Sequence, residues 1–563
     1  MTFTPAATEQ RFVLDTVAGL SSLGVDGDIV DAVLDGAGAF AAGEWAPLDR
    51  AGDTIGAKWT SDGVVMPEGY RAAYQAYVEG GWGTIGSPEA FGGQGLPISL
   101  ATAVLETLGT ANCGFALCPT LNVGAIEALM HHGSQAQQAA YLPKLSTGAW
   151  TGTMNLTEPQ AGSDVGALKT MAKPRGDGTW SIKGTKIFIS FGDHDLTDNI
   201  VHLVLARTPD APAGTKGISL FLVPKFRLND DGTPGSFNDV RVVSIEHKMG
   251  LHASPTCVLS FGDHDDCIGE LIGAEFGGIR AMFTMMNNAR LNVGLQGVQV
   301  AERATQRAVA YARERVQGYR EGKPTAIIEH PDVRRMLLRM KAQTMAARAL
   351  VYYAFGQLDR ANAGDGAAKA RLDLLTPLAK AHGTDLGNEV ASLGVQVHGG
   401  MGYIEETGAA QHFRDARITP IYEGTNGIQA ADLVGRKLTG DAGAALFALT
   451  GEMRGQAQDV RLIALIAACD EAARRLLSVE SDDRLAASYP FLTMLSVATC
   501  GWLMEQQRRA VEQANVDPAF RAMKQAAADF YVQQIVPEAL GLKAAATADA
   551  AMLYAVDAET FAA

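Results

Sequence analysis

A carboxylate in the run IYEGTNG, residues 421–427, is the strongest candidate for proton-transfer chemistry in this sequence. Glu423 follows the aromatic Tyr422 and precedes the flexible Gly424. A carboxylate that is enclosed beside an aromatic ring loses hydration, and this raises its pKa toward the range in which it accepts protons at neutral pH. An ordinary polar turn contains the same residue types. The run therefore predicts either a general base or an exposed loop acid.

Three further runs accompany the first. They are LTEPQAGSD at residues 156–164, KIFIS at residues 186–190 and QVHGGMGY at residues 396–403. In this order and at these separations, the four runs resemble those of the acyl-CoA dehydrogenase family of flavoproteins. The resemblance covers about residues 40 to 440. It implies FAD as cofactor, no metal, and α,β-dehydrogenation of an acyl-CoA thioester to the trans-2-enoyl-CoA.

The resemblance also implies the roles at the reaction centre. Glu423 is expected to remove the α-proton while flavin N5 accepts the β-hydride, and Arg290 is expected to lie beneath the catalytic segment. Some family members carry the base just before that arginine, where this chain has Ala289, which cannot act as a base. Glu405 and Glu406 remain alternatives by proximity in sequence. The expected substrate-binding residues are Ser163, Tyr422, Glu423 and Gly424.

Flavin contacts are expected from the runs at residues 156–164 and 186–190. Backbone amides and hydroxyls of the first run suit the flavin pyrimidine and a phosphate, because a glycine lets the chain approach closely. In the second run an aromatic residue and a hydroxyl replace the Trp and Thr that are usual in the family. The residues concerned are Met154, Thr157, Gly162, Ser163, Phe188 and Ser190.

A second set of flavin contacts implies an oligomer. Arg315 matches an arginine that reaches the pyrophosphate of a neighbouring subunit's flavin, and guanidinium suits phosphate because it donates two parallel hydrogen bonds. Gln396, Gly399 and Gly400 resemble the segment that follows the partner's adenosine diphosphate. Thr425 is expected to bind the pyrophosphate of its own flavin. A homodimer is the expected assembly. The chain departs from the family after Arg315, where residues 316–318 are one residue tighter, and at position 427, where glycine replaces the usual glutamine.

The pattern of apolar residues predicts a mostly α fold with a central β-domain. We expect an N-terminal helical domain (1–150), a middle β-domain (151–270), a helical bundle with the catalytic base (271–440) and an additional C-terminal helical domain (441–563). The last domain has no chemical motif and is interpreted as a packing or oligomerisation module. These features most resemble the larger bacterial branch of the family, which includes 3-methylmercaptopropionyl-CoA dehydrogenases, so 3-(methylthio)propanoyl-CoA or another short or medium acyl-CoA is the expected substrate.

Composition narrows the alternatives. The chain has 563 residues and a net charge of -15, which argues against a nucleic-acid footprint. The six scattered cysteines are interpreted as reduced core thiols, and no apolar run approaches about 20 residues, so we expect a cytoplasmic protein without a membrane span. Electron-transferring flavoprotein is the expected electron acceptor. Two other readings stay open: a DNA-associated flavoprotein of the alkylation-response type, and an acyl-CoA oxidase.

Overall fold

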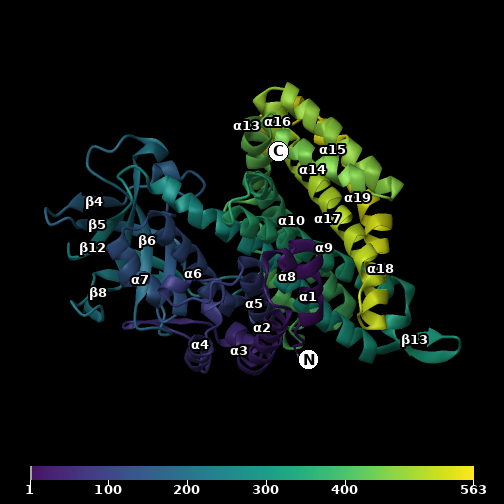
Figure 1. Ribbon diagram of the computed structural model, residues 1–563, viewed down its shortest axis with the longest axis horizontal. Helices are drawn as coiled ribbons and strands as arrows, with labels where there is room; N and C mark the ends of the chain where they lie inside the picture. Colours follow the sequence, from purple (N-terminus) through teal and green to yellow (C-terminus); the bar gives the residue numbers. More distant parts are fainter. Residues whose placement is uncertain (1–2) are drawn as a thin grey trace. The chain divides into compact units, whose positions relative to one another are not determined.

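The computed structural model describes residues 3–563, which form two compact units (Figure 1). One unit is Asp35–Ala289, and the other combines Met1–Leu34 with Arg290–Ala563. Two helices, α2 (Gly27–Phe40) and α8 (Gly278–Glu314), contribute residues to both units.

The unit of residues 35–289 is built around an eight-stranded sheet. Its strands follow the order β10-β11-β5-β12-β7-β6-β3, with β4 pairing β5 and β6. Most neighbours are antiparallel, but β6 runs parallel to β3 and to β4. The strands are β3 (Thr151–Asn155), β4 (Met171–Pro174), β5 (Trp180–Ser190), β6 (Ile200–Arg207), β7 (Ile218–Pro224), β10 (Val240–Ile245), β11 (Thr256–Phe261) and β12 (Ile268–Ile272). Two small ribbons pair β1 (Lys58–Thr60) with β2 (Gly63–Val65), and β8 (Phe226–Leu228) with β9 (Pro234–Phe237).

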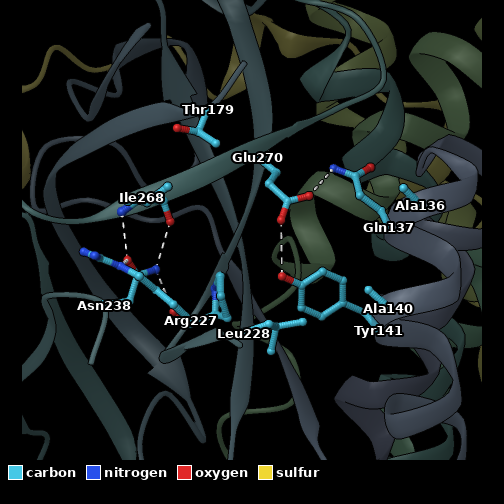
Figure 2. A pocket seen from close by; sticks show the side chains of 11 residues that line it. Ala136, Gln137, Ala140, Tyr141, Thr179, Arg227, Leu228, Asn238, Ile268 and Glu270 are labelled. Carbon is cyan, nitrogen blue, oxygen red and sulfur yellow. Dashed lines mark hydrogen bonds between the residues drawn. The ribbon is translucent and has the colours of Figure 1, made fainter. Parts of the chain in front are cut away.

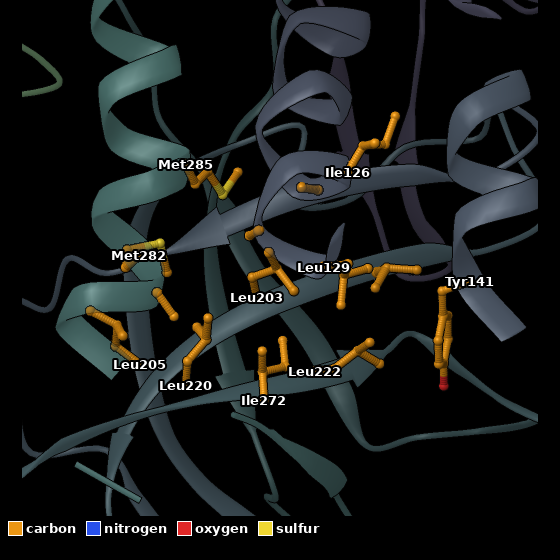
Figure 3. Close-up of a cluster of buried hydrophobic side chains, with 14 of the residues drawn as sticks. Ile126, Leu129, Tyr141, Leu203, Leu205, Leu220, Leu222, Ile272, Met282 and Met285 are labelled. Carbon is orange, nitrogen blue, oxygen red and sulfur yellow. The ribbon is translucent and has the colours of Figure 1, made fainter. Parts of the chain in front are cut away.

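Helices cover one face of this sheet and form its main core (Figure 3). Leu203, Leu220 and Leu222 point from the strands toward Leu129 of α6 and Met285 of α8, and all five are buried. Burial of branched and long apolar side chains is the main stabilising contribution to such a layer. The helices of this unit are α3 (Ala46–Ile55), α4 (Tyr70–Glu79), α5 (Ile98–Ala111), α6 (Cys113–His132) and α7 (Gln135–Thr147).

Helix α6 differs from the expectation that no apolar run approaches membrane-spanning length. Its best 18-residue window has a mean hydropathy of 1.4, which is long and apolar enough to cross a membrane. Most of that window is buried, and the helix packs against β3, α5 and α7. A central helix that is covered on several sides needs few charged residues, so its composition follows from its place in the core.

The second unit is helical. Helix α9 (Pro331–Asn362) packs along α10 (Gly366–His398), and the shorter α11 (Ala409–Ala416) and α12 (Asn426–Asp432) pack on α10. The N-terminal helix α1 (Ala7–Val13) belongs to this unit, where Glu9 accepts a hydrogen bond from Lys524 at 2.8 Å. An exposed hairpin of β13 (Val316–Arg320) and β14 (Lys323–Ala326), which the sequence pattern did not reveal, follows α8.

The residues after 440 add a layer of helices to the same unit, coloured green to yellow in Figure 1. The longest, α17, packs against α9, α10, α12, α15 and α18. After the short α13 (Leu438–Gly440), the helices of this layer are α14 (Ala444–Gln456), α15 (Val460–Ser478), α16 (Ser481–Ala486), α17 (Ser488–Gln513), α18 (Pro518–Phe530) and α19 (Val536–Leu540). The predicted fold class, mostly α with a central β-domain and extra C-terminal helices, is confirmed. All six cysteines are free and buried, as expected.

Candidate active site

The loop that follows β3 is fastened to β5 by a buried ion pair that sequence reasoning missed. Lys186 Nζ lies 2.8 Å from Glu158 Oε1 and also donates to the Leu156 carbonyl at 3.1 Å. Glu158 accepts further hydrogen bonds from Thr170 and from the Lys169 amide. Although burial raises it, the charge of Lys186 and these hydrogen bonds hold the pKa of Glu158 down to about 2. The run at residues 156–164 therefore rests on a fixed anion.

A β-bulge turns Phe188 away from the sheet. Strict alternation would place Phe188 on the same face as Lys186, but Lys186 is fully buried whereas Phe188 is 58% exposed. The pairing of β5 with β11 shifts register at this point, and Phe188 has a φ of +59°. A bulge commonly redirects one side chain. It leaves an aromatic ring exposed at the edge of the run that was predicted to bind flavin.

The other residues that were predicted to bind flavin leave polar groups and space for a ligand. The hydroxyls of Thr157, Ser163 and Ser190 have no hydrogen-bond partner within the described part of the chain, and Ser163 is exposed. Gly162 is also exposed, and a Cβ added to it would meet nothing within 4 Å. Met154, in β3 just before the run at residues 156–164, is half-buried. Open space, unpaired donors and an exposed ring are what a planar polar cofactor needs.

Glu423 lies in the other unit, on a tight loop before α12. Its φ of +56° lies in the left-handed region, which is costly for a residue with a side chain, and Gly424 continues the turn with a φ of +83°. The Asn426 amide closes the loop by donating to the Pro420 carbonyl at 2.9 Å. Tyr422 donates its hydroxyl proton to Gln296 of α8. The loop thus holds Glu423 in a direction that an ordinary turn would not adopt.

The charges of two buried cations act on this carboxylate. Burial raises the pKa of Glu423 to about 7, against the opposing charges of Arg290 and Lys380. Arg290 is buried, and a Cβ added to Gly424 would lie 3.8 Å from its guanidinium. Arg290 therefore lies next to the loop that carries Glu423. Together these groups could hold and release one proton near neutral pH.

Lys380 is a site residue that the sequence analysis missed. It is fully buried in α10, and burial lowers its pKa to about 8, against the opposing charges of Glu423 and Asp385. Its Nζ donates to Asn426 Oδ1 at 2.9 Å. A lysine within the apolar run LLTPLAKAHG was the available signal, because an isolated charge in a buried helix needs a partner.

The residues that were predicted to reach a partner's flavin gather at one end of the helical unit. Tyr311 stacks on His398, with ring centroids 4.4 Å apart, and this joins the end of α8, just before Arg315, to the end of α10. Arg315 is exposed and has no ion-pair partner among residues 3–563. Gln396, Gly399 and Gly400 are exposed as well.

Thr425, which was predicted to bind the flavin pyrophosphate, has a structural role in the loop. Its hydroxyl oxygen caps α12 by accepting a hydrogen bond from the Ile428 amide at 3.1 Å. The hydroxyl proton remains available to a ligand, because the cap uses only the oxygen as acceptor.

The two alternative acids differ from Glu423. Glu405 is exposed and forms an ion pair with Arg414 at 2.9 Å, and Glu406 is exposed on the same short turn.

A cavity of about 340 Å³ lies elsewhere in the unit of residues 35–289 (Figure 2). Glu270 in its wall accepts hydrogen bonds from Gln137 and Tyr141, so its carboxylate is already paired. None of the predicted site residues lines it.

Comparison with known proteins identifies the chain. Models of the acyl-CoA dehydrogenase N-terminal, middle and C-terminal domains match residues 30–149, 153–264 and 277–438, and an acetyl-CoA dehydrogenase C-terminal-like model matches residues 445–557. The 3-methylmercaptopropionyl-CoA dehydrogenase of Ruegeria pomeroyi is 47% identical over 539 residues, which is 91% of each chain. A butyryl-CoA dehydrogenase of Syntrophomonas wolfei is 37% identical, over 93% of this chain and 92% of its own.

A solved structure shares the fold. The acyl-CoA dehydrogenase of Bacillus anthracis complexed with FAD has a TM-score of 0.70 and 22% identity, and the match covers 87% of this chain and 85% of that one. The family matches span the four predicted runs as well as the C-terminal helices. This chain therefore belongs to the acyl-CoA dehydrogenase family and is an FAD-dependent acyl-CoA dehydrogenase.

Proposed function

We propose that Glu423 is the base that removes the α-proton of the acyl-CoA thioester. The observation that carries the proposal is its environment: a half-buried carboxylate with a pKa raised to about 7, on a constrained loop, under the influence of two buried cations. A general base works best when its pKa lies near the working pH. The exposed and paired Glu405 lacks these properties.

The remaining residues orient the reaction. The carboxylate of Glu423 receives the proton, and Arg290 and Lys380 keep enough of it ionised at neutral pH. The backbone N–H of Glu423 is available to hold the thioester oxygen, where it would stabilise enolate-like charge. Residues 154–163 and 188–190 would hold FAD, which when bound would supply the hydride acceptor for the β-carbon.

We propose a short acyl chain, with 3-(methylthio)propanoyl-CoA as the first candidate substrate. The support is the 47% identity over nearly the full length with a 3-methylmercaptopropionyl-CoA dehydrogenase. Butanoyl-CoA is the second candidate, because a butyryl-CoA dehydrogenase matches over a similar length. Fold alone does not choose between thioesters, so the choice rests on these relatives.

The resemblance to the family also supports proposals for the assembly, the electron acceptor, the location and the domain boundaries. We propose a homodimer in which Arg315 and Gln396 reach the neighbour's flavin, electron-transferring flavoprotein as acceptor, and a cytoplasmic location. The domain limits at residues 150, 270 and 440 are part of the proposal. Sedimentation of the flavin-loaded protein tests the assembly: an active, flavin-saturated monomer would contradict it.

Anaerobic titration with a panel of acyl-CoA thioesters tests the substrate. We expect 3-(methylthio)propanoyl-CoA to bleach the visible flavin band faster than butanoyl-CoA, and long-chain thioesters to be slowest. A faster reaction with a long-chain thioester would overturn the substrate proposal. Turnover measured in air distinguishes a dehydrogenase from an acyl-CoA oxidase, because an oxidase produces hydrogen peroxide in stoichiometric amounts. A protein that no thioester reduces, but that binds DNA in a salt-sensitive way, would favour the DNA-associated reading.

A further inference from the structure

A continuous line of polar side chains connects the C-terminal helices to the Glu423 loop. Tyr489, in the first turn of α17, donates its hydroxyl proton to Asp385 Oδ2 at 2.7 Å. Asp385 Oδ1 accepts from Asn426 Nδ2 at 2.8 Å. Asn426 Oδ1 accepts from Lys380 Nζ at 2.9 Å. Each hydrogen bond joins residues of different elements, so the line passes from α17 through α10 and the start of α12.

Asn426 is the junction of this line. Its side chain is buried, and its backbone N–H closes the turn that carries Glu423. Besides Asp385 and Lys380, its amide side chain contacts Thr384 Oγ1 at 2.9 Å and the Ala381 carbonyl at 3.1 Å. An amide group with this many partners has one orientation, because rotating it would exchange its donor and acceptor. A shift of Asn426 would therefore move the turn.

Lys380 links the junction to the base. It is fully buried, and its hydrogen bond fixes it on Asn426. The charge of Glu423 is the main one that opposes the lowering of the Lys380 pKa by burial. A buried ammonium that loses a hydrogen-bond partner either moves or loses its proton. Both responses would change the field at Glu423, so the orientation of Asn426 reaches the carboxylate through Lys380 as well as through the backbone.

The C-terminal helices supply the outer end of the line. Helix α17 packs on both α10 and α12, the two helices that Asp385 and Asn426 join. Tyr489 is 37% exposed, so its ring contributes modestly to the core, whereas its hydroxyl meets a half-buried carboxylate. We propose that Tyr489 and Asp385 are positioning residues through which the C-terminal helices hold the Glu423 loop, an inference that rests on the proposed role of Glu423.

Substitution of the hydroxyl tests this inference. In the flavin-loaded full chain, Tyr489→Phe should lower kcat roughly 5- to 10-fold, a loss of the size that one ordinary hydrogen bond corresponds to, with little change in KM. Asp385→Asn should lower kcat similarly, and the double variant should be no slower than the slower single variant, because both break the same line. Flavin content and the thermal unfolding midpoint should stay close to wild type for Tyr489→Phe.

Tyr554→Phe is the matched control. Tyr554 lies near the C-terminus, is 72% exposed and has no hydrogen-bond partner for its hydroxyl in the described structure. If Tyr489→Phe behaves like this control, or if the two single losses multiply in the double variant, the inference is wrong. If Tyr489→Phe loses flavin or unfolds, Asp385→Asn tests the inference in its place. A lower kcat with little change in KM would support the inference, and an unchanged kcat would contradict it. Near-normal turnover by Glu423→Gln would instead remove the proposed base, which is a distinguishable failure.

Discussion

The proposed flavin-binding face of residues 35–289, which carries Thr157, Ser163 and Ser190, and the Glu423 loop of the other unit use their polar groups in different ways. On the first, the hydroxyls of Thr157, Ser163 and Ser190 are unpaired within the described residues, and the charged pair of Glu158 and Lys186 is hidden behind them. On the second, the buried charges lie beside the candidate base itself. Binding a large cofactor requires free donors on a rigid support, whereas proton transfer requires charges that act on one carboxylate.

Removal of the base should give the largest effect. Glu423→Gln preserves the shape of the side chain but cannot accept the α-proton, so kcat should fall about 10³-fold while flavin content stays normal. Turnover is measured with the thioester that best bleaches the wild-type flavin band. Glu405→Gln, which changes an exposed acid on a neighbouring loop, should keep wild-type kcat. Equal losses in the two variants would end the distinction between the loops.

Breaking the hidden charge pair should act on stability instead. Lys186→Met leaves Glu158 buried without its cation, and we expect a loss of about 3–5 kcal/mol in the free energy of unfolding of the flavin-free protein. Urea unfolding followed by circular dichroism measures this loss. Lys183→Met is the control. Lys183 lies in the same strand as Lys186 and forms an exposed ion pair with Asp265, so its loss should leave the unfolding midpoint unchanged. A midpoint for Lys186→Met that equals the control would show that the pair does not support the flavin-binding loop.

The pH dependence of kcat/KM should respond to the charges around Glu423 and not to the hydroxyls of the proposed flavin-binding face. With Glu423 as the proposed base and its pKa raised to about 7, kcat/KM should rise about tenfold per pH unit below pH 7 and level off above it. Lys380 opposes the upward shift of that pKa, so Lys380→Met should move the acid limb to higher pH. Ser190→Ala, on the open face, should leave the limb in place. A limb that does not move with Lys380 would mean that this cation does not control the base.

The same pKa has a consequence for stability with a definite sign. The folded pKa of Glu423 is raised from 4.5 to about 7, so the ionised carboxylate favours unfolding, and stability is lost as the pH rises through this window. The flavin-free Glu423→Gln protein should therefore melt at a higher temperature than wild type at pH 8, and the difference should shrink toward pH 4.5. Scanning calorimetry at both pH values measures it, and a difference of the opposite sign would contradict the raised pKa.

Local sequence patterns predicted the fold and the main runs, whereas they did not predict which polar residues distant in sequence contact each other. The alternation in residues 180–190 indicated a strand, but a bulge depends on the neighbouring strand, so the outward turn of Phe188 could not be read from it. Glu423 stood out because its neighbours in sequence define its chemistry. Lys380 and Asp385 did not, because their partners come from other elements; Tyr489 is 104 positions from Asp385. Periodicity locates a helix and its buried face, but it does not identify which polar residues of two helices meet.

The smallest expected effect concerns the open face. Ser163→Ala removes one free hydroxyl, and loss of a single neutral hydrogen bond corresponds to about a fivefold weaker flavin affinity. Titration of flavin-free protein with FAD measures this change, and Ser236→Ala, at another exposed serine of the same unit, is the control. The unfolding midpoint of the flavin-free Ser163→Ala protein should equal that of wild type, because the hydroxyl has no partner there to lose. A variant that binds FAD normally but unfolds earlier would mean that Ser163 supports its own loop, and the flavin-binding face would then resemble the Glu423 loop in using its polar groups internally.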